Sequence, residues 1–144
     1  MTIDFGYGVV MDDAEFKIDA AKYVLDNFAT KEILAEFDEF KKDNPDLVDE
    51  DEAKVIFVDE YEDHTYYESG ICGLLVKCIN ELECGGEHKF EYQDYCIYVG
   101  ARIPSDNKEK IKMLTQEDIR KILTKYLNPI LEGNVSLGFL EIHN

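Results

Sequence analysis

The sequence has few basic residues for its size. Lysine and arginine number 15 against 32 aspartates and glutamates, which gives a formal net charge of −17 at pH 7. Binding to the phosphate backbone of nucleic acids needs a basic surface, and so does attraction to an anionic membrane. The charge therefore excludes direct nucleic-acid binding as an ordinary function and argues against a membrane as partner.

Long apolar runs and targeting features are also lacking. No apolar run approaches the roughly 20 residues that a membrane-spanning helix needs. Residues 1–5 have neither the basic nor the apolar region of a secretory signal. We therefore expect a cytoplasmic protein whose four cysteines are reduced thiols and not disulfides.

Motifs that bind cofactors and metals are missing as well. The chain has no Gly-x-Gly-x-x-Gly fingerprint, no phosphate-binding loop ending in Lys-Ser/Thr, and no Cys-x-x-Cys pair. We expect neither a cofactor nor a metal ion.

What the sequence does contain is a balanced apolar pattern. Its 144 residues are 45% hydrophobic and 12% aromatic, which predicts that residues 1–144 form a single acidic domain with its own core. Periodicity predicts strands at 3–9, 54–58, 89–92, 95–102 and 135–142, and helices that begin at Asp12, Thr30, Ser69 and Thr115.

This order, β-α-α-β-α-β-(β)-α-β, predicts an α+β fold. We expect a mixed or antiparallel sheet of about four or five strands, with about four helices packed on one of its faces. Gly6 and Gly8 alternate with the apolar residues of the first strand, which indicates close packing or a bend at that point.

The negative charge is concentrated in the first half of the chain. Residues 1–68 hold 21 acidic and 6 basic residues, a net charge of 6 − 21 = −15, whereas residues 69–144 hold 11 and 9. Asymmetry of this kind informs about partners more than about fold.

Two segments carry most of this charge. In the second predicted helix, acids recur at helical spacing and should form one solvent-facing stripe. Further along, carboxylates alternate with tyrosines, which are enriched at binding interfaces. The residues in question are Glu32, Glu36, Glu39 and Asp43 in the helix, and Asp59, Glu60, Tyr61, Glu62, Asp63, Tyr66 and Tyr67 in the second segment.

A regular row of carboxylates can imitate a row of phosphates and attract a basic groove. In size and charge, though not in motif, the chain resembles small phage-encoded proteins that block restriction or CRISPR nucleases. The leading hypothesis is a non-enzymatic inhibitor that mimics nucleic acid and binds the basic surface of a nucleic-acid-binding protein. The plainer alternative is a solvated face that keeps the protein soluble.

Other functions stay open. Cys72 at a helix N-terminus, His88 downstream and Asp94 as its orienting group follow the chain order of papain-like thiol hydrolases. A small-molecule-binding or assembly domain is a third alternative. A homo-oligomer is possible if the basic residues near the last helix pair with the acidic half of another copy. These basic residues are Lys108, Lys110, Lys112, Arg120, Lys121 and Lys125.

Overall fold

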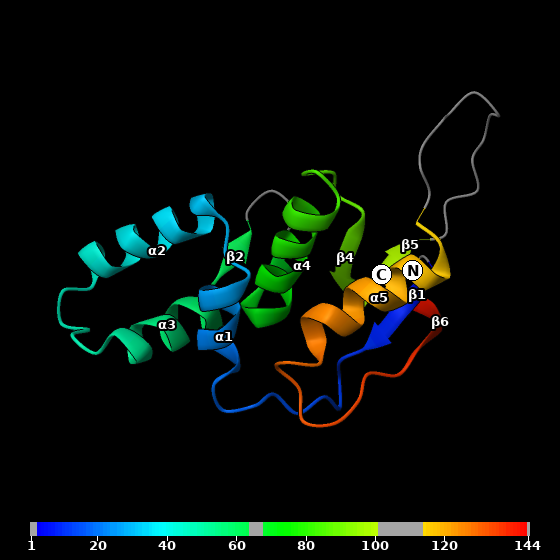
Figure 1. The fold of residues 1–144 in the computed structure, drawn as a ribbon, viewed down its shortest axis with the longest axis horizontal. Coiled ribbons are helices and arrows are strands. Elements are labelled where there is room, and N and C mark those ends of the chain that lie inside the picture. Colours follow the sequence, from blue (N-terminus) through cyan, green and yellow to red (C-terminus); the bar gives the residue numbers. More distant parts are fainter. Residues whose placement is uncertain (1–2, 64–67, 101–113, 144) are drawn as a thin grey trace.

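A computed structural model describes residues 3–63, 68–100 and 114–143. It confirms an α+β fold with a four-stranded antiparallel sheet in the order β4-β5-β1-β6 (Figure 1). The sheet strands are β1 (Ile3–Val10), β4 (Phe90–Gln93), β5 (Cys96–Gly100) and β6 (Leu137–His143).

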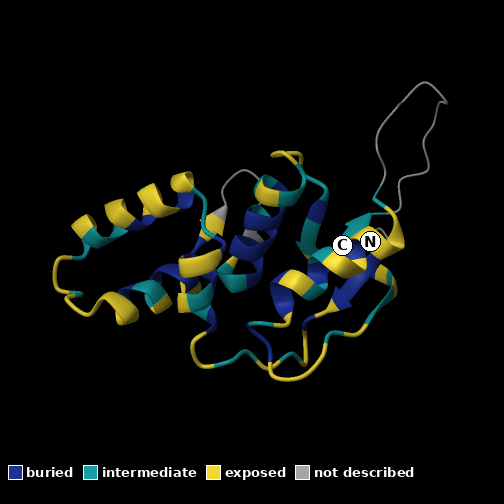
Figure 2. Ribbon diagram, in the orientation of Figure 1, coloured by how far each residue is buried: buried dark blue, intermediate teal, exposed yellow. Residues whose placement is uncertain are grey.

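Two helices lie against one face of this sheet. They are α4 (Gly70–Glu83) and α5 (Gln116–Leu127). Tyr7 and Val9 of β1 and Ile97 of β5 point into the main core that these helices cover. Eight of the 14 residues of α4 are buried, and Figure 2 shows much of the helix in the colour of buried residues, so the core of the molecule runs along this helix.

Gly6 and Gly8 confirm the expected close packing. A methyl group at Gly8 would overlap the carbonyl oxygen of Ile97, and one at Gly6 would lie 2.5 Å from Tyr98 Cδ2. The ring of Tyr98 therefore occupies the space beside Gly6, and the β5 backbone at Ile97 and Tyr98 occupies the space beside Gly8.

The sheet is also curled. Ile142 pairs with Asp4 at one end of β1, and Cys96 pairs with Val10 near the other end. In a flat sheet these positions would be about 20 Å apart along the strand. Ile142 nevertheless packs with Cys96 and Tyr98 in a second small core, and the backbone N–H of His143 donates to Asp94 Oδ2 at 3.1 Å. The end of β6 therefore reaches the β4–β5 turn.

Three helices of the first half extend away from the sheet. They are α1 (Ala20–Asn27), α2 (Lys31–Asp43) and α3 (Glu50–Asp59). A short ladder of β2 (Glu62–Asp63) and β3 (Glu68–Ser69) leads from α3 into α4. We call residues 31–62 the acidic arm, because α2 and α3 project from the rest of the molecule (Figure 1) and the segment carries 13 acidic and four basic residues.

The predicted strand at 54–58 is wrong, because these residues lie inside α3. Asp49 accepts hydrogen bonds from the backbone N–H groups of Asp51 (2.9 Å) and Glu52 (3.3 Å) and so caps the helix. The acidic run at 49–52 is thus the start of the helix, where carboxylates are favoured by the helix dipole. The observed order is β-α-α-α, the short β2–β3 ladder, then α-β-β-α-β.

The predicted start of the first helix at Asp12 is also wrong, because α1 begins at Ala20. The preceding segment uses its backbone groups elsewhere. Lys17 N–H donates to the Ile130 carbonyl at 2.8 Å, and Glu132 N–H donates to the Glu15 carbonyl at 2.8 Å. Pairing with a remote segment replaces the helical hydrogen bonds that the local pattern predicts.

The other boundaries agree closely with the sequence. Thr30 and Thr115 cap α2 and α5 with their side chains. The predicted hairpin is present, with a two-residue turn at Asp94-Tyr95 whose φ angles of 51° and 58° are those of a type I′ turn. Ser69 stands at the N-cap position of α4 but makes no capping hydrogen bond through its side chain.

Candidate functional site

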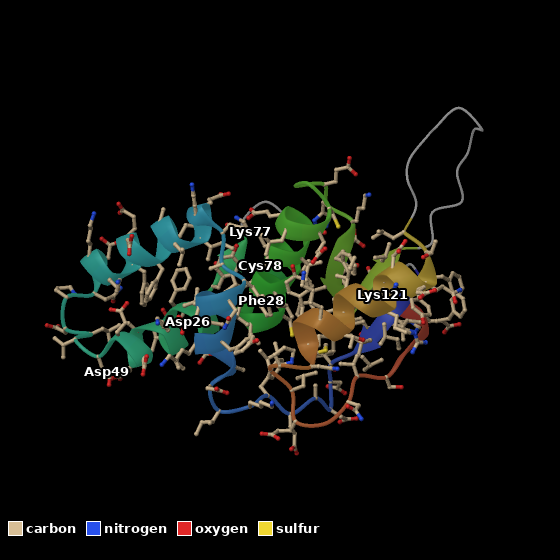
Figure 3. All side chains as sticks on the ribbon, viewed as in Figure 1. Asp26, Phe28, Asp49, Lys77, Cys78 and Lys121 are labelled. Atoms are coloured by element: carbon tan, nitrogen blue, oxygen red, sulfur yellow. The ribbon has the colours of Figure 1, made fainter. Side chains whose placement is uncertain are left out.

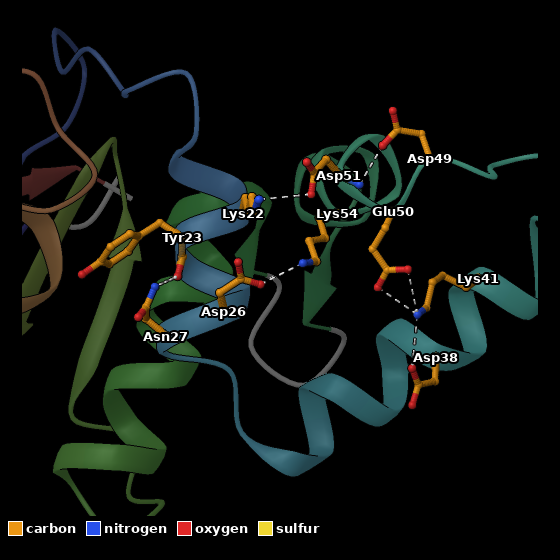
Figure 4. Close-up of polar contacts among 10 residues, drawn as sticks. All are labelled: Lys22, Tyr23, Asp26, Asn27, Asp38, Lys41, Asp49, Glu50, Asp51 and Lys54. Atoms are coloured by element: carbon orange, nitrogen blue, oxygen red, sulfur yellow. Dashed lines mark hydrogen bonds and ion pairs between the residues drawn. The ribbon is translucent and has the colours of Figure 1, made fainter.

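The acidic arm is held in place by ion pairs between its helices and α1 (Figure 4). Lys54 Nζ lies 2.9 Å from Asp26 Oδ1, and Lys22 Nζ lies 3.4 Å from Asp51 Oδ1. The hydrogen bond to Asp26 raises the pKa of Lys54 above its usual value. In these two pairs each helix contributes one lysine and one aspartate, so α3 and α1 are joined twice.

A third cationic group joins α2 to α3. Lys41 Nζ lies 3.2 Å from Glu50 Oε1 and 3.7 Å from Asp38 Oδ1. The same ammonium group lies 4.7 Å from the ring centroid of Phe37. An aromatic ring and two carboxylates thus hold one cation at the surface of the arm.

The predicted stripe on α2 is exposed, but part of it has a partner. Lys77 of α4 lies 3.6 Å from Glu32 Oε1 and 4.0 Å from Glu36 Oε1. Figure 3 labels this lysine at the side of α4 toward α2. Glu39 and Asp43 are exposed further along the helix. All four residues of the predicted stripe are thus exposed, and Glu32 and Glu36 in addition anchor α2 to α4.

The second predicted segment divides into different environments. Asp59, Glu60 and Glu62 are exposed. Tyr61 was predicted as an exposed contact residue, but only 5% of it is accessible and its ring packs against Phe57 at 6.2 Å between centroids. The side chain of Asp63 lies outside the described residues, as do Tyr66 and Tyr67.

The structure brings the two acidic segments together around one surface hollow of about 350 Å³. Its lining combines three carboxylates with three aromatic rings: Glu36, Glu60, Glu62, Phe40, Phe57 and Tyr61. The ring centroid of Phe57 lies 5.5 Å from that of Phe40 and 5.3 Å from that of Phe37. The hollow is thus lined by an aromatic cluster between α2 and the end of α3.

Sequence reasoning missed Phe40 and Phe57 as members of this site. Phe40 was expected only on the buried face of its helix, and Phe57 was assigned to a strand. The helical signal was the Asp49 cap followed by buried Ala53 and Phe57 at i, i+4 spacing. Nothing local in the sequence could place Glu60 and Glu62 beside Glu36.

The arrangement does not suit a metal ion. No group of three His, Cys, Asp or Glu side chains within the described ranges is placed to hold one.

The alternative thiol site is not assembled. Cys72 is the third residue of α4, as expected, but it is 7% exposed, and burial raises the pKa of its thiol to about 11. His88 lies beside Asn80 (Nδ1 to Nδ2, 3.5 Å), which is eight residues or about 12 Å further along the helix. Desolvation outweighs the hydrogen bond with Tyr92, which acts to lower the pKa of the Cys72 thiol, because a thiolate would have to form in an apolar environment.

Asp94 does not orient His88 either. Its carboxylate accepts the N–H of His143, and β4 separates it in the chain from His88, whose Nε2 lies 3.7 Å from Glu91 Oε1. The three residues of the proposed thiol hydrolase thus have separate surroundings.

The basic cluster of the second half is partly engaged within the molecule. Lys125 Nζ lies 2.8 Å from Glu83 Oε1, Lys121 Nζ lies 3.5 Å from Glu117 Oε1, and Arg120 donates to the Tyr7 hydroxyl at 3.2 Å. The remaining members of the cluster, Lys108, Lys110 and Lys112, lie outside the described residues.

Two broader findings complete the description. Within the part of the chain that the structure describes, no helix has the length and apolar character needed to traverse a membrane. Comparison with protein-family models, with curated proteins and with solved structures finds no match for this chain.

Proposed function

We infer that the chain is a non-enzymatic acidic interaction protein of the cytoplasm, and that its acidic arm occupies the basic groove of a nucleic-acid-binding protein. A restriction or CRISPR nuclease is the kind of partner that this surface fits. Binding would exclude nucleic acid from the groove, so the protein would act as an inhibitor by mimicry.

The observation that carries this proposal is the placement of charge on the arm. Residues 31–62 have a net charge of −9, and α2 and α3 project from the core with most of their carboxylates exposed. Fixed carboxylates on a protruding, ion-paired pair of helices create a persistent negative potential, which steers a basic partner and makes association sensitive to salt.

The test is a charge reversal of four exposed arm acids that lie outside the hollow and outside the ion pairs described above. The variant carries Glu39→Lys, Asp43→Lys, Asp46→Lys and Asp59→Lys. Proteins captured from lysate by the unmodified chain are identified and assayed for nucleic-acid binding with and without the chain. We expect the captured partner to lose nucleic acid when the chain binds, and we expect the reversed variant to lose the partner.

A matched control separates location from total charge. Asp12→Lys, Asp13→Lys, Glu15→Lys and Glu132→Lys change the net charge by the same amount at exposed positions outside the arm. The control should retain binding, weakened only modestly and restored at low salt. Equal losses in both variants, or a captured protein that does not bind nucleic acid, would rule the proposal out.

A further inference from the structure

We propose that the hollow between α2 and the end of α3 is a seat for one arginine side chain of the partner. The inference rests on the proposed function, since it names the anchor by which a basic surface is gripped. It assigns a distinct role to Glu36, Glu60 and Glu62, apart from the general charge of the arm.

The lining of the hollow supports a cation with a flat, weakly hydrated body. Aromatic rings attract such a group through their negatively charged faces, and carboxylates bind guanidinium through paired N–H donors. Here both kinds of group meet, because the half-buried Phe40 contributes an accessible ring, with the buried rings of Phe57 and Tyr61 beside it, while the carboxylates come from α2 and from the segment after α3. A volume of about 350 Å³ is at the small end of the range of about 300–1,000 Å³ for ligand sites, which suits a single side chain.

The same chemistry is already used a short distance away in the arm. Lys41 is held by the Phe37 ring and by Asp38 and Glu50. Phe37 and Phe40 both stack on Phe57, so the internal cation site and the hollow are lined by one aromatic cluster. The hollow repeats the combination of ring and carboxylates at a position open to a partner.

The charges around the hollow favour a cation from outside. Lys77 approaches Glu36 at 4.0 Å. Within the described ranges, the ion pairs of the arm involve Lys22, Lys41, Lys54 and Lys77, and none of these pairs includes Glu60 or Glu62. A guanidinium group carries five N–H donors in a fixed planar fork, so it can bind more than one carboxylate at a time.

The experiment uses small probes, so that it does not depend on finding the partner. A blocked tripeptide with one arginine between two glycines is titrated into the isotope-labelled full chain, and backbone and ring signals are followed by NMR. The matched peptides replace arginine by citrulline, its neutral isostere, or by lysine. We expect saturable shifts at Phe40, Phe57 and Tyr61 with millimolar affinity for arginine, several-fold weaker binding of lysine, and no binding of citrulline.

Variants then test the two parts of the seat separately. Glu60→Gln with Glu62→Gln should weaken arginine binding about tenfold, whereas the exposed pair Glu132→Gln with Glu141→Gln should leave it unchanged. Phe40→Leu, at a half-buried position that tolerates an aliphatic residue, should weaken arginine binding about threefold without loss of the helical circular dichroism signal.

The outcomes separate this inference from the proposed function. Shifts spread over the whole arm, equal binding of lysine and arginine, or binding that survives Glu60→Gln with Glu62→Gln would overturn the seat. If capture of the partner depends on the arm charges but not on Glu60 and Glu62, the hypothesis of an arginine seat would be wrong and the hypothesis of nucleic-acid mimicry would stand. Specific arginine binding without any nucleic-acid-binding partner would support the seat alone.

Discussion

Helices α2 and α4 have nearly the same length but very different surroundings. Eight of the 14 residues of α4 are buried, among them Leu74, Leu75 and Ile79, whereas only Ile33 and Phe37 are buried among the 13 of α2. Figure 2 shows the contrast along the two helices. Each fully buried aliphatic side chain contributes about 1.5–3 kcal/mol, so α4 is held by the core.

The comparison shows that stability and charge are carried by different regions. The sheet with α4 and α5 buries its apolar residues and has a nearly neutral sequence, with 11 acidic and nine basic residues in 69–144. The acidic arm contributes six buried side chains to the core and is further positioned by caps and ion pairs. The six are Ile33, Phe37, Ala53, Phe57, Val58 and Tyr61. Most of its surface positions can therefore bear carboxylates at little cost to the fold.

The largest effect should come from filling the space beside β1. In Gly8→Ala the new methyl group would overlap the Ile97 carbonyl and lie 2.6 Å from Tyr98 Cα. Both are backbone atoms of the paired strand, so relief requires breaking the β1–β5 ladder. We expect the free energy of unfolding, measured by urea denaturation, to fall by about 3 kcal/mol or more.

A glycine in the same sheet provides the control for this prediction. Gly138 pairs with Gly8 across the β1–β6 ladder, and nothing lies within 4 Å of a methyl group added there. Gly138→Ala should change stability by no more than about 0.5 kcal/mol. Similar stabilities for the two alanine variants would contradict the close packing of Tyr98.

A smaller, local effect is expected in the arm. Lys54→Met keeps the aliphatic stem but removes the ion pair with Asp26, in which 16% of the lysine side chain is exposed. The loss of about 1 kcal/mol should speed amide hydrogen exchange in α3 about fivefold and leave α4 unchanged. Lys31→Met, at an exposed position on α2, serves as control, and a uniform change across the molecule would argue against an independently held arm.

The smallest effect concerns the pH dependence of stability that arises from Glu83 of α4. Hydrogen bonds from Lys125 (2.8 Å) and Tyr126 (2.9 Å) lower the pKa of Glu83 below its ordinary value of 4.5, with the bond from Lys125 as the larger cause and burial opposing it. A lowered carboxyl pKa stabilises the fold above pH 4.5, and this stabilisation is lost as the pH falls through the lower value. The free energy of unfolding of the unmodified protein should exceed that of the Glu83→Gln variant by about 0.5–1 kcal/mol at pH 7.

Acid titration of the two proteins checks that sign. The difference in unfolding free energy should shrink steadily below pH 4.5 and vanish once Glu83 is protonated in the native state. A difference that stays constant with pH, or grows under acid, would mean that the Glu83 carboxylate does not link α4 to α5 through its charge.

Particular elements show how far sequence reasoning reached. Thr30 and Thr115 as starts of helices and the alternating residues in β1 were recognised because each signal lies within one or two turns of its effect. The strand at 54–58 was wrong because a short apolar run fits a strand as well as a helix, and the cap at Asp49 decided for a helix. The site was predicted as exposed acids, yet Tyr61 is buried, and Phe40 and Phe57 were missing from it.

By itself, the sequence determined the α+β class, the caps and the concentration of acids in the first half, because these follow from composition and from contacts a few residues apart. Only the tertiary structure decided that Lys77 pairs with Glu32 and Glu36, that the sheet curls around Tyr98, and that Glu36 meets Glu60 and Glu62 over an aromatic cluster. Such contacts depend on the packing of elements that are distant in the chain, which is decided by shape and burial over the whole molecule and leaves no periodic signal in the sequence.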